Sequence, residues 1–228
     1  MPRRPGASRR HRVRQLHASE KPPVELREVA AADDRLGLIR VHCGQVERPD
    51  VAIGADIGGS HISCAAVGLN DLRIFRDTLT ERAVDNKASA DEILNIWAEA
   101  LSDSIKKVPG QLIKGIGFGM PGPFDYVNGV CYIKGVAKYE NLYGWNVKDA
   151  ISERLKSFGE FPVRFMNDVS AFAVGEALVG KASSAGRSMA ITLGTGFGSA
   201  FIDNRIPICD GPEVPELGCV YHLPYGDN

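Results

Sequence analysis

The sequence lacks the features that mark several common protein classes. None of its apolar runs approaches the roughly 18 residues that a membrane-spanning helix needs. The five cysteines are odd in number and scattered, and no C-x-x-C pair occurs, so neither a disulfide framework nor a cysteine zinc site is indicated. Positive and negative charges nearly balance over the 228 residues. We therefore expect a globular, cytoplasmic protein of one large or two small domains, without a membrane partner.

The first fifty residues are predicted to be a basic extension of the folded chain. Their opening, PRRPGASRRHRVR, is rich in arginine and shows neither a helical nor an alternating apolar period. An unstructured extension is the preferred interpretation of residues 1–50, and a nucleic-acid-binding arm and an organelle leader stay open. Helix-turn-helix binding needs two consecutive amphipathic helices, and Pro22-Pro23 interrupts the candidate region. Nucleic acid is therefore not the expected partner.

Two glycine turns organise the remainder of the sequence. In VAIGADIGGSHISCAAVGL (51–69), two alternating apolar stretches flank Gly58-Gly59, a turn that we expect to need positive φ, and Asp56 comes just before it. A second copy of this pattern is MAITLGTGFGSAFI (189–202). Glycines alone are weak evidence, because ordinary hairpins also use them. An acidic residue within an otherwise apolar strand is less common.

Helices and strands alternate between these turns, which indicates the α/β class. Ser89 opens a capping box, and apolar residues repeat at helical spacing until Pro109-Gly110. Residues 111–120 and 161–166 are predicted strands, and Val127-Asn128-Gly129-Val130 predicts a hairpin. Asn146 can cap a helix that runs to about residue 158, and residues 170–179 form a predicted helix that Gly180 ends.

One motif is misleading. Gly117 to Gly122 matches G-x-G-x-x-G, which in a dinucleotide-binding fold requires a helix to open at the third glycine. Pro121, Pro123 and the following Asn128-Gly129 turn favour a loop and hairpin instead. We reject the dinucleotide-binding interpretation.

The residue types at the turns suit phosphoryl transfer. Consecutive N–H groups in a glycine turn form an anion site, which fits Gly58-Gly59-Ser60 and Gly194-Thr195-Gly196. Asp56 is placed to hold Mg²⁺, and Asp168 could accept a hydroxyl proton as that oxygen attacks a γ-phosphate. Asn167 could hydrogen-bond the same polyol. The alternative for Asp168 is a helix cap, and for Asp56 a cap of its own turn.

Residues 51–228 resemble the ROK family of sugar kinases and sugar-sensing repressors, in the actin–hexokinase–Hsp70 superfamily. Four segments carry the resemblance: DIGGSH (56–61) to D-I-G-G-T-K, GFGMPGP (117–123) to the G-x-P-G segment, NDVSA (167–171) together with Trp145 to the N-D-x-x-A site, and LGTGFG (193–198) to L-G-T-G-x-G. It implies a ribonuclease-H-like (actin-like ATPase) two-lobe architecture, with the second lobe only partly present. The implied lobes are residues 51–185, with the sugar site, and 186–228.

The sequence also departs from the family pattern. Where the family has G-E-x-G-H, this chain has Pro215-Glu216-Leu217-Gly218-Cys219, so Glu216 matches the acid and Cys219 replaces the histidine. The family's cysteine-rich zinc motif is absent, and Cys219 with His222 would be too few ligands, so zinc is not predicted. His61, at the usual lysine position, is expected to pack or hydrogen-bond locally.

The resemblance implies an ATP- and Mg²⁺-dependent kinase for a hexose or N-acetylhexosamine, similar to glucokinase. Asp168 is the expected base, Asp56 the Mg²⁺ residue and the two glycine turns the nucleotide site. The expected substrate-binding residues are Asn167, Glu216, Gly119 and Pro121. Two alternatives remain, a sugar-sensing transcriptional regulator of the same family and a catalytically inactive truncated form. The family is often dimeric, which leaves a homodimer open.

Overall fold

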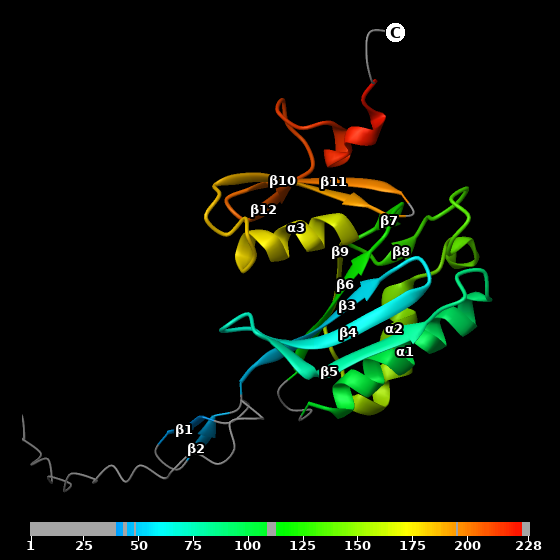
Figure 1. Cartoon of the computed structure of the whole chain (residues 1–228). Coiled ribbons are helices and arrows are strands. Elements are labelled where there is room, and N and C mark those ends of the chain that lie inside the picture. Colours follow the sequence, from blue (N-terminus) through cyan, green and yellow to red (C-terminus); the bar gives the residue numbers. More distant parts are fainter. Residues whose placement is uncertain (1–39, 43–44, 48, 109–112, 195, 225–228) are drawn as a thin grey trace, which may run out of the picture. The chain divides into compact units, whose positions relative to one another are not determined.

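The structure is a computed structural model that describes residues 40–42, 45–47, 49–108, 113–194 and 196–224 (Figure 1). Residues Leu38–Asn228 form one compact unit, while the unit Met1–Gly37 lies outside the described residues. Within the segment predicted to be an extension, β1 (Arg40–His42) and β2 (Gln45–Glu47) pair as antiparallel strands. The arginine-rich opening belongs to the part that is not described.

A five-stranded sheet with the order β5-β4-β3-β6-β9 forms the centre of the compact unit. Its strands are β3 (Val51–Ile57), β4 (His61–Gly68), β5 (Ile74–Ala83), β6 (Ile113–Met120) and β9 (Val163–Asn167). The pairs β3–β4 and β4–β5 are antiparallel, whereas β3–β6 and β6–β9 are parallel. This is the predicted ribonuclease-H-like arrangement. The three parallel strands end at the same edge, where ligands bind in open α/β sheets.

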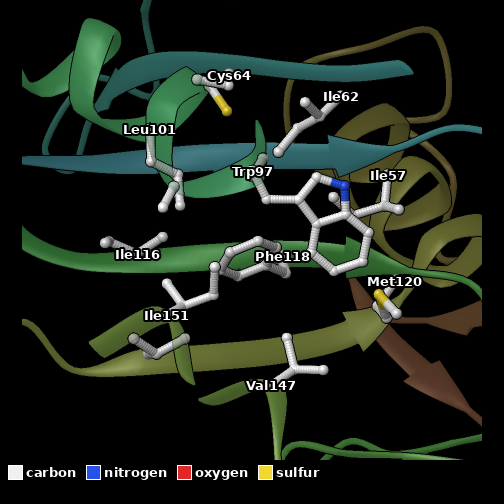
Figure 2. Close-up of a cluster of buried hydrophobic side chains, with 14 of the residues drawn as sticks. Ile57, Ile62, Cys64, Trp97, Leu101, Ile116, Phe118, Met120, Val147 and Ile151 are labelled. Carbon is white, nitrogen blue, oxygen red and sulfur yellow. The ribbon is translucent and has the colours of Figure 1, made fainter. Parts of the chain in front are cut away.

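Helix α1 (Ala90–Lys106) covers one face of this sheet. Ser89 and Glu92 form the predicted capping box, in which each side chain accepts a hydrogen bond from the other residue's main-chain N–H. Figure 2 shows Trp97 and Leu101 of α1 directed at the apolar side chains of the strands. Both helix residues are fully buried. Burial of this apolar face, rather than intrinsic propensity, is the main stabilisation of such a helix.

Helix α2 (Val147–Leu155) completes the same core. The Asn146 side chain accepts a hydrogen bond from Asp149 N, as predicted for its cap, and the 3-10 turn η3 (Lys156–Phe158) extends the helix. Val147 and Ile151 are fully buried and point into the cluster shown in Figure 2. Further buried core positions come from β3, β4, β6 and β9, and from the segment between β6 and α2, which contributes Cys131, Tyr139 and Leu142.

A second sheet, of three antiparallel strands, follows helix α3. Its strands are β10 (Arg187–Leu193), β11 (Phe197–Asp203) and β12 (Ile206–Ile208), and they lie in the order β10-β11-β12. Helix α3 (Asp168–Leu178) contributes Val169, Ala173 and Ala177 to a separate apolar cluster with Ala200 and Ile202 of β11. In Figure 1, α3 lies between the two sheets. It therefore connects the edge of the first sheet to the second.

One local prediction was wrong, and another is confirmed. Gly58 and Gly59 do not adopt positive φ. Gly58 is instead tightly approached by a neighbouring side chain, because a Cβ built there would lie 2.6 Å from His61 Cε1. The predicted hairpin exists as β7 (Phe124–Asp125) and β8 (Val130–Cys131), but four residues connect its strands and only Gly129 of the Asn128-Gly129 pair has positive φ.

The rejection of the dinucleotide-binding motif is confirmed. Strand β6 ends at Met120, and the chain then passes through a cis Gly122–Pro123 peptide into β7 rather than into a helix. The short 3-10 turn η2 (Glu140–Leu142) lies between β8 and α2. No helix in the described part of the chain has the length and apolar character needed to cross a membrane.

Candidate active site

The first glycine turn connects β3 to β4. Two side chains fix it by donating hydrogen bonds to the carbonyl groups of the turn. The Tyr139 hydroxyl donates to Gly58 O at 2.6 Å, and Asn86 Nδ2 donates to Gly59 O. Gly58 N donates to His61 O at 2.9 Å, whereas no protein acceptor is found among the described residues for the N–H groups of Gly59 and Ser60. These two N–H groups are therefore available to an anion.

His61 lies beside this turn, as the sequence predicts. Its imidazole ring packs over Gly58, where a Cβ would lie 2.9 Å from the Nδ1 atom. Any larger residue at position 58 would displace the ring. Glycine is therefore needed at this position for the close approach of a side chain, and not for its backbone conformation.

Asp56 and Asp168 are brought together across Gly119. Asp56 and Gly119 are direct partners in the β3–β6 register. A Cβ built on Gly119 would lie 3.5 Å from Asp56 Oδ1 and 3.7 Å from Asp168 Cα. Loss of water around its carboxyl raises the pKa of Asp56, the nearby Asp168 raises it further, and His61 partly opposes this. The expected Mg²⁺ residue and the expected base are thus electrostatic neighbours.

The start of α3 determines the orientation of Asn167 and Asp168. Asn167, and not Asp168, is the helix cap, because its Oδ1 accepts hydrogen bonds from Val169 N and Ser170 N, both at 3.1 Å. Asp168 is the first residue of the helix. Its Oδ1 accepts from Asn167 Nδ2 at 2.9 Å and from Val169 N at 3.0 Å. The alternative of Asp168 as the cap is therefore wrong.

The second glycine turn joins β10 to β11. Gly194 N donates to Gly196 O at 3.0 Å, and Thr195 lies outside the described residues. A Cβ on Gly194 or Gly196 would meet no other residue's atoms within 4 Å among those described. Gly194 does not have positive φ. The described protein atoms around these two glycines therefore do not require the lack of a side chain at either position.

The structure explains why position 198 is a glycine, which the sequence alone did not reveal. A Cβ there would lie 2.5 Å from Val169 Cγ2 and 2.6 Å from Thr192 Oγ1. Glycine therefore allows β11 to approach α3 closely, next to Asp168. The only hint in the sequence is that Gly198 closes the LGTGFG motif.

Glu216 is exposed and lies in a turn. Hydrogen bonds of a buried serine of β11, Ser199, fix this turn to the strand. This turn comprises the 3-10 segments η4 (Glu216–Gly218) and η5 (Val220–His222). Ser199 Oγ donates to Gly218 O at 2.7 Å and accepts from Val220 N at 3.0 Å. Cys219, at the expected histidine position, donates its thiol to Leu217 O at 3.5 Å, and burial raises the pKa of this thiol.

The two substrate-binding predictions on the β6 segment, Gly119 and Pro121, fall on buried residues. The residue that projects from this region toward Asn167 is Tyr126, which no sequence signal marks. Its hydroxyl donates to Met120 O at 3.1 Å and accepts from Asn167 Nδ2 at 3.4 Å. Tyr126 thus connects the end of β6 to the start of α3.

The donor set at this edge fits Mg²⁺ in the way that kinase sites use it. Such sites supply one or two carboxylates and leave the other ligands to water and substrate phosphates. Asp56, with Asp168 beside it, can provide these carboxylates. No group of three or more potential ligand side chains occurs in the described part of the chain, so an all-protein metal cage is not formed there.

Comparison with known proteins agrees with this arrangement. Glucokinase of Thermotoga maritima is 28% identical over 175 residues, which are 76% of this chain and 51% of that protein. N-acetyl-D-glucosamine kinase of Mannheimia succiniciproducens is 28% identical over 153 residues, covering 66% of this chain and 45% of that one. The chain thus spans about half the length of the curated relatives it matches.

A solved structure shows the same fold. The ROK family glucokinase from Streptomyces griseus, in complex with glucose and AMPPNP, aligns with a TM-score of 0.57 and 23% identity over 74% of this chain and 48% of that chain. The model of the ROK family matches residues 52–227. This match covers all four motifs described above and both sheets around them, and the chain belongs to the ROK family.

Proposed function

We propose that this chain belongs to an ATP- and Mg²⁺-dependent kinase that phosphorylates a hydroxyl group of a hexose or N-acetylhexosamine in the cytoplasm. The observation that carries the proposal is the pattern of hydrogen bonds around the Asp168 carboxylate. Its Oδ1 accepts two hydrogen bonds from the chain, and no partner of Oδ2 is found among the described residues. A carboxylate that is fixed through one oxygen and open at the other suits a general base.

The proposed reaction is a direct transfer. Asp168 Oδ2 takes the proton of the sugar hydroxyl, whose oxygen forms a bond to the γ-phosphorus of ATP. The bond from that phosphorus to the bridging oxygen breaks, and ADP leaves with the electron pair. Asp56 would hold Mg²⁺, which supplies positive charge against the phosphate oxygens.

The two glycine turns are the proposed phosphate sites. The free N–H groups of Gly59 and Ser60 support this role for the first turn. At the second turn, Gly194 and Gly196 leave open space where side chains would otherwise stand, which supports close approach of a ligand to the main chain. Thr195 remains the predicted hydroxyl donor of this turn.

The sugar is proposed to lie beside Asn167 and Glu216, above the buried Gly119 and Pro121. Both hydrogens of Asn167 Nδ2 are directed at protein oxygens, namely Asp168 Oδ1 and Tyr126 Oη. We propose that the sugar lies against the Asn167 side chain while both of these contacts stay in place. The relatives named glucokinase and N-acetyl-D-glucosamine kinase support the two sugar classes.

The direct test is ATP-dependent phosphorylation by the full chain of glucose, N-acetylglucosamine, N-acetylmannosamine and fructose. We expect Asp168→Ala to lower kcat roughly 10²- to 10⁴-fold, the usual contribution of a general base. Asp91→Asn, which removes an exposed carboxylate at the start of α1, is the control and should leave kcat unchanged. A kcat that is unchanged by Asp168→Ala would overturn the assigned base.

A second measurement separates binding from catalysis. A ligand that binds only the folded state raises the unfolding midpoint, so Mg²⁺–ATP should raise the Tm of the chain. The rise should be smaller in Asp56→Ala. Absence of both a Tm shift and phosphorylation would contradict the proposed kinase function for this chain.

A further inference from the structure

Tyr126 occupies a specific place beside the proposed base. It lies in the four-residue connection between β7 and β8, with its ring tilted against Phe124 at a centroid distance of 5.4 Å. A Cβ built on Gly122 would lie 3.0 Å from the Tyr126 hydroxyl oxygen. The small residue at position 122 therefore leaves room for this hydroxyl group beneath the start of α3.

The orientation of the Asn167 amide follows from its capping role. Its Oδ1 is occupied by the N–H groups of Val169 and Ser170, so its Nδ2 must face the opposite direction. There, one hydrogen is donated to Asp168 Oδ1 at 2.9 Å and the other to Tyr126 Oη at 3.4 Å. Without an acceptor at the position of Tyr126, the second hydrogen of this part-buried amide would lose its protein partner.

The Tyr126 hydroxyl is itself fixed. It donates its only proton to Met120 O, the last carbonyl of β6, so its lone pairs are left for Asn167. Burial raises the pKa of Tyr126 to about 12. The hydrogen bond from Asn167 partly opposes this rise, and the negative charge of Asp168 adds to it. The hydroxyl group therefore stays protonated, and keeps both roles, throughout the neutral pH range.

We propose that Tyr126 is a positioning residue for phosphoryl transfer: it holds the Asn167 amide, and through Asn167 it holds the Asp168 carboxylate with Oδ1 toward the protein and Oδ2 toward the sugar. This inference rests on the proposed kinase function only for its effect on rate. The hydrogen-bond chain Met120–Tyr126–Asn167–Asp168 exists independently of that function.

The first test needs no catalysis. Tyr126→Phe removes one oxygen and keeps the ring, so exchange of the Asn167 side-chain amide hydrogens, followed by NMR, should become roughly twofold to tenfold faster, the factor expected for loss of one neutral hydrogen bond. Ser102→Ala is the matched control, because it also removes a hydroxyl group that donates to a main-chain carbonyl, on α1. Unchanged exchange in Tyr126→Phe would overturn the proposal, whatever the activity of the chain.

The second test is a double-mutant cycle on kcat. Tyr126→Phe should lower kcat roughly tenfold, since small misplacement of a catalytic group costs up to about 100-fold. Asn167→Ser keeps a good helix cap but removes the amide hydrogens. In that background Tyr126→Phe should change kcat less than about twofold, because its effect passes through Asn167. An equal loss in both backgrounds would show that Tyr126 acts by another route and would contradict the inference.

The two tests also distinguish this inference from the proposed function. A chain without kinase activity, but with faster Asn167 exchange in Tyr126→Phe, would refute the kinase and support the positioning role. An active chain whose kcat is insensitive to Tyr126→Phe would support the kinase and refute the positioning role.

Discussion

The Tyr139 hydroxyl donates a 2.6 Å hydrogen bond to Gly58 O, a carbonyl that lies 81 residues earlier in the sequence. Tyr139 is fully buried, and its ring packs edge-on against Trp97 with centroids 5.4 Å apart. The first proposed phosphate turn is thus held directly by the apolar core that α1 forms with the sheet. Stability of the core and geometry of the turn are coupled through this one side chain.

Tyr139→Phe should separate these two contributions. The ring and its contact with Trp97 remain, so we expect a loss of only about 1 kcal/mol in the free energy of unfolding, typical of one hydrogen bond. The freed Gly58 carbonyl should loosen the turn and weaken Mg²⁺–ATP binding roughly threefold to tenfold, measured by titration calorimetry. Ser102→Ala, which removes a comparable hydrogen bond within α1, should leave nucleotide affinity unchanged. Equal affinities in all three proteins would contradict the coupling.

Ser199 offers a similar test for the Glu216 turn. Its hydroxyl group is buried and makes two hydrogen bonds with that turn, so Ser199→Ala leaves Gly218 O and Val220 N without their partner. We expect a loss of about 1–3 kcal/mol in the free energy of unfolding, measured by urea denaturation.

The same substitution should raise the sugar KM more than the ATP KM, because Glu216 is proposed to contact the sugar. Ser104→Ala is the control for stability alone. Its hydroxyl is fully buried between α1 and β5, where it donates to Thr78 O at 2.7 Å. A sugar KM that rises equally in both variants would exclude a specific role for the Glu216 turn.

Substitution with alanine can distinguish the roles of the glycines in the second turn and in the strand β11 that follows it. Gly198→Ala places a methyl group against Val169 and Thr192 and should cost about 1–3 kcal/mol of stability, as overpacking does. Gly196→Ala meets open space, so its free energy of unfolding should stay within about 0.5 kcal/mol of the original value. Its ATP affinity should nevertheless fall if phosphate approaches this turn. Thermal unfolding with and without Mg²⁺–ATP measures both effects, and an unchanged affinity in Gly196→Ala would count against a phosphate site there.

The sequence was informative wherever a local rule governs the structure. Ser89 and Asn146 were identified as helix caps because a cap is determined by a few adjacent residues. The α/β class and the motifs followed from apolar period and from the resemblance to the family. The position of Asp168 between the end of a strand and a helix was also predicted, because a polar pair directly follows an apolar run there.

The missed features depend on contacts between distant segments. Tyr126, Tyr139 and Ser199 act through hydrogen bonds to residues that are 41, 81 and 19 positions away, respectively, and no local pattern encodes such partners. The positive φ predicted for Gly58 was wrong for the same reason. What requires glycine there is the approach of the His61 ring, a side-chain contact that the turn's composition does not reveal.

The raised pKa of Asp56 leads to a prediction about how the free energy of unfolding depends on pH. Because its pKa is raised in the folded protein, first by desolvation and then by Asp168, its ionised form is less favourable in the folded state than in the unfolded state. Below an unfolded pKa of about 3.9 the carboxyl is protonated in both states and contributes no such penalty. As the pH rises through the folded pKa, the penalty appears. Asp56→Asn should therefore be more stable than the original chain at pH 7, and this difference should shrink toward pH 3.

Asp103 is the control with the opposite sign. A hydrogen bond from Arg82 lowers the pKa of Asp103, so its ionised form is favoured in the folded state and Asp103→Asn should lose stability at pH 7. Denaturant unfolding of both variants from pH 3 to pH 7 makes the comparison. In an Asp168→Asn background the stability gained from Asp56→Asn should be smaller, since one of the two causes is gone. A gain that is unchanged in that background would mean that Asp168 does not act on Asp56, and the proposed arrangement of metal residue and base would have to be abandoned.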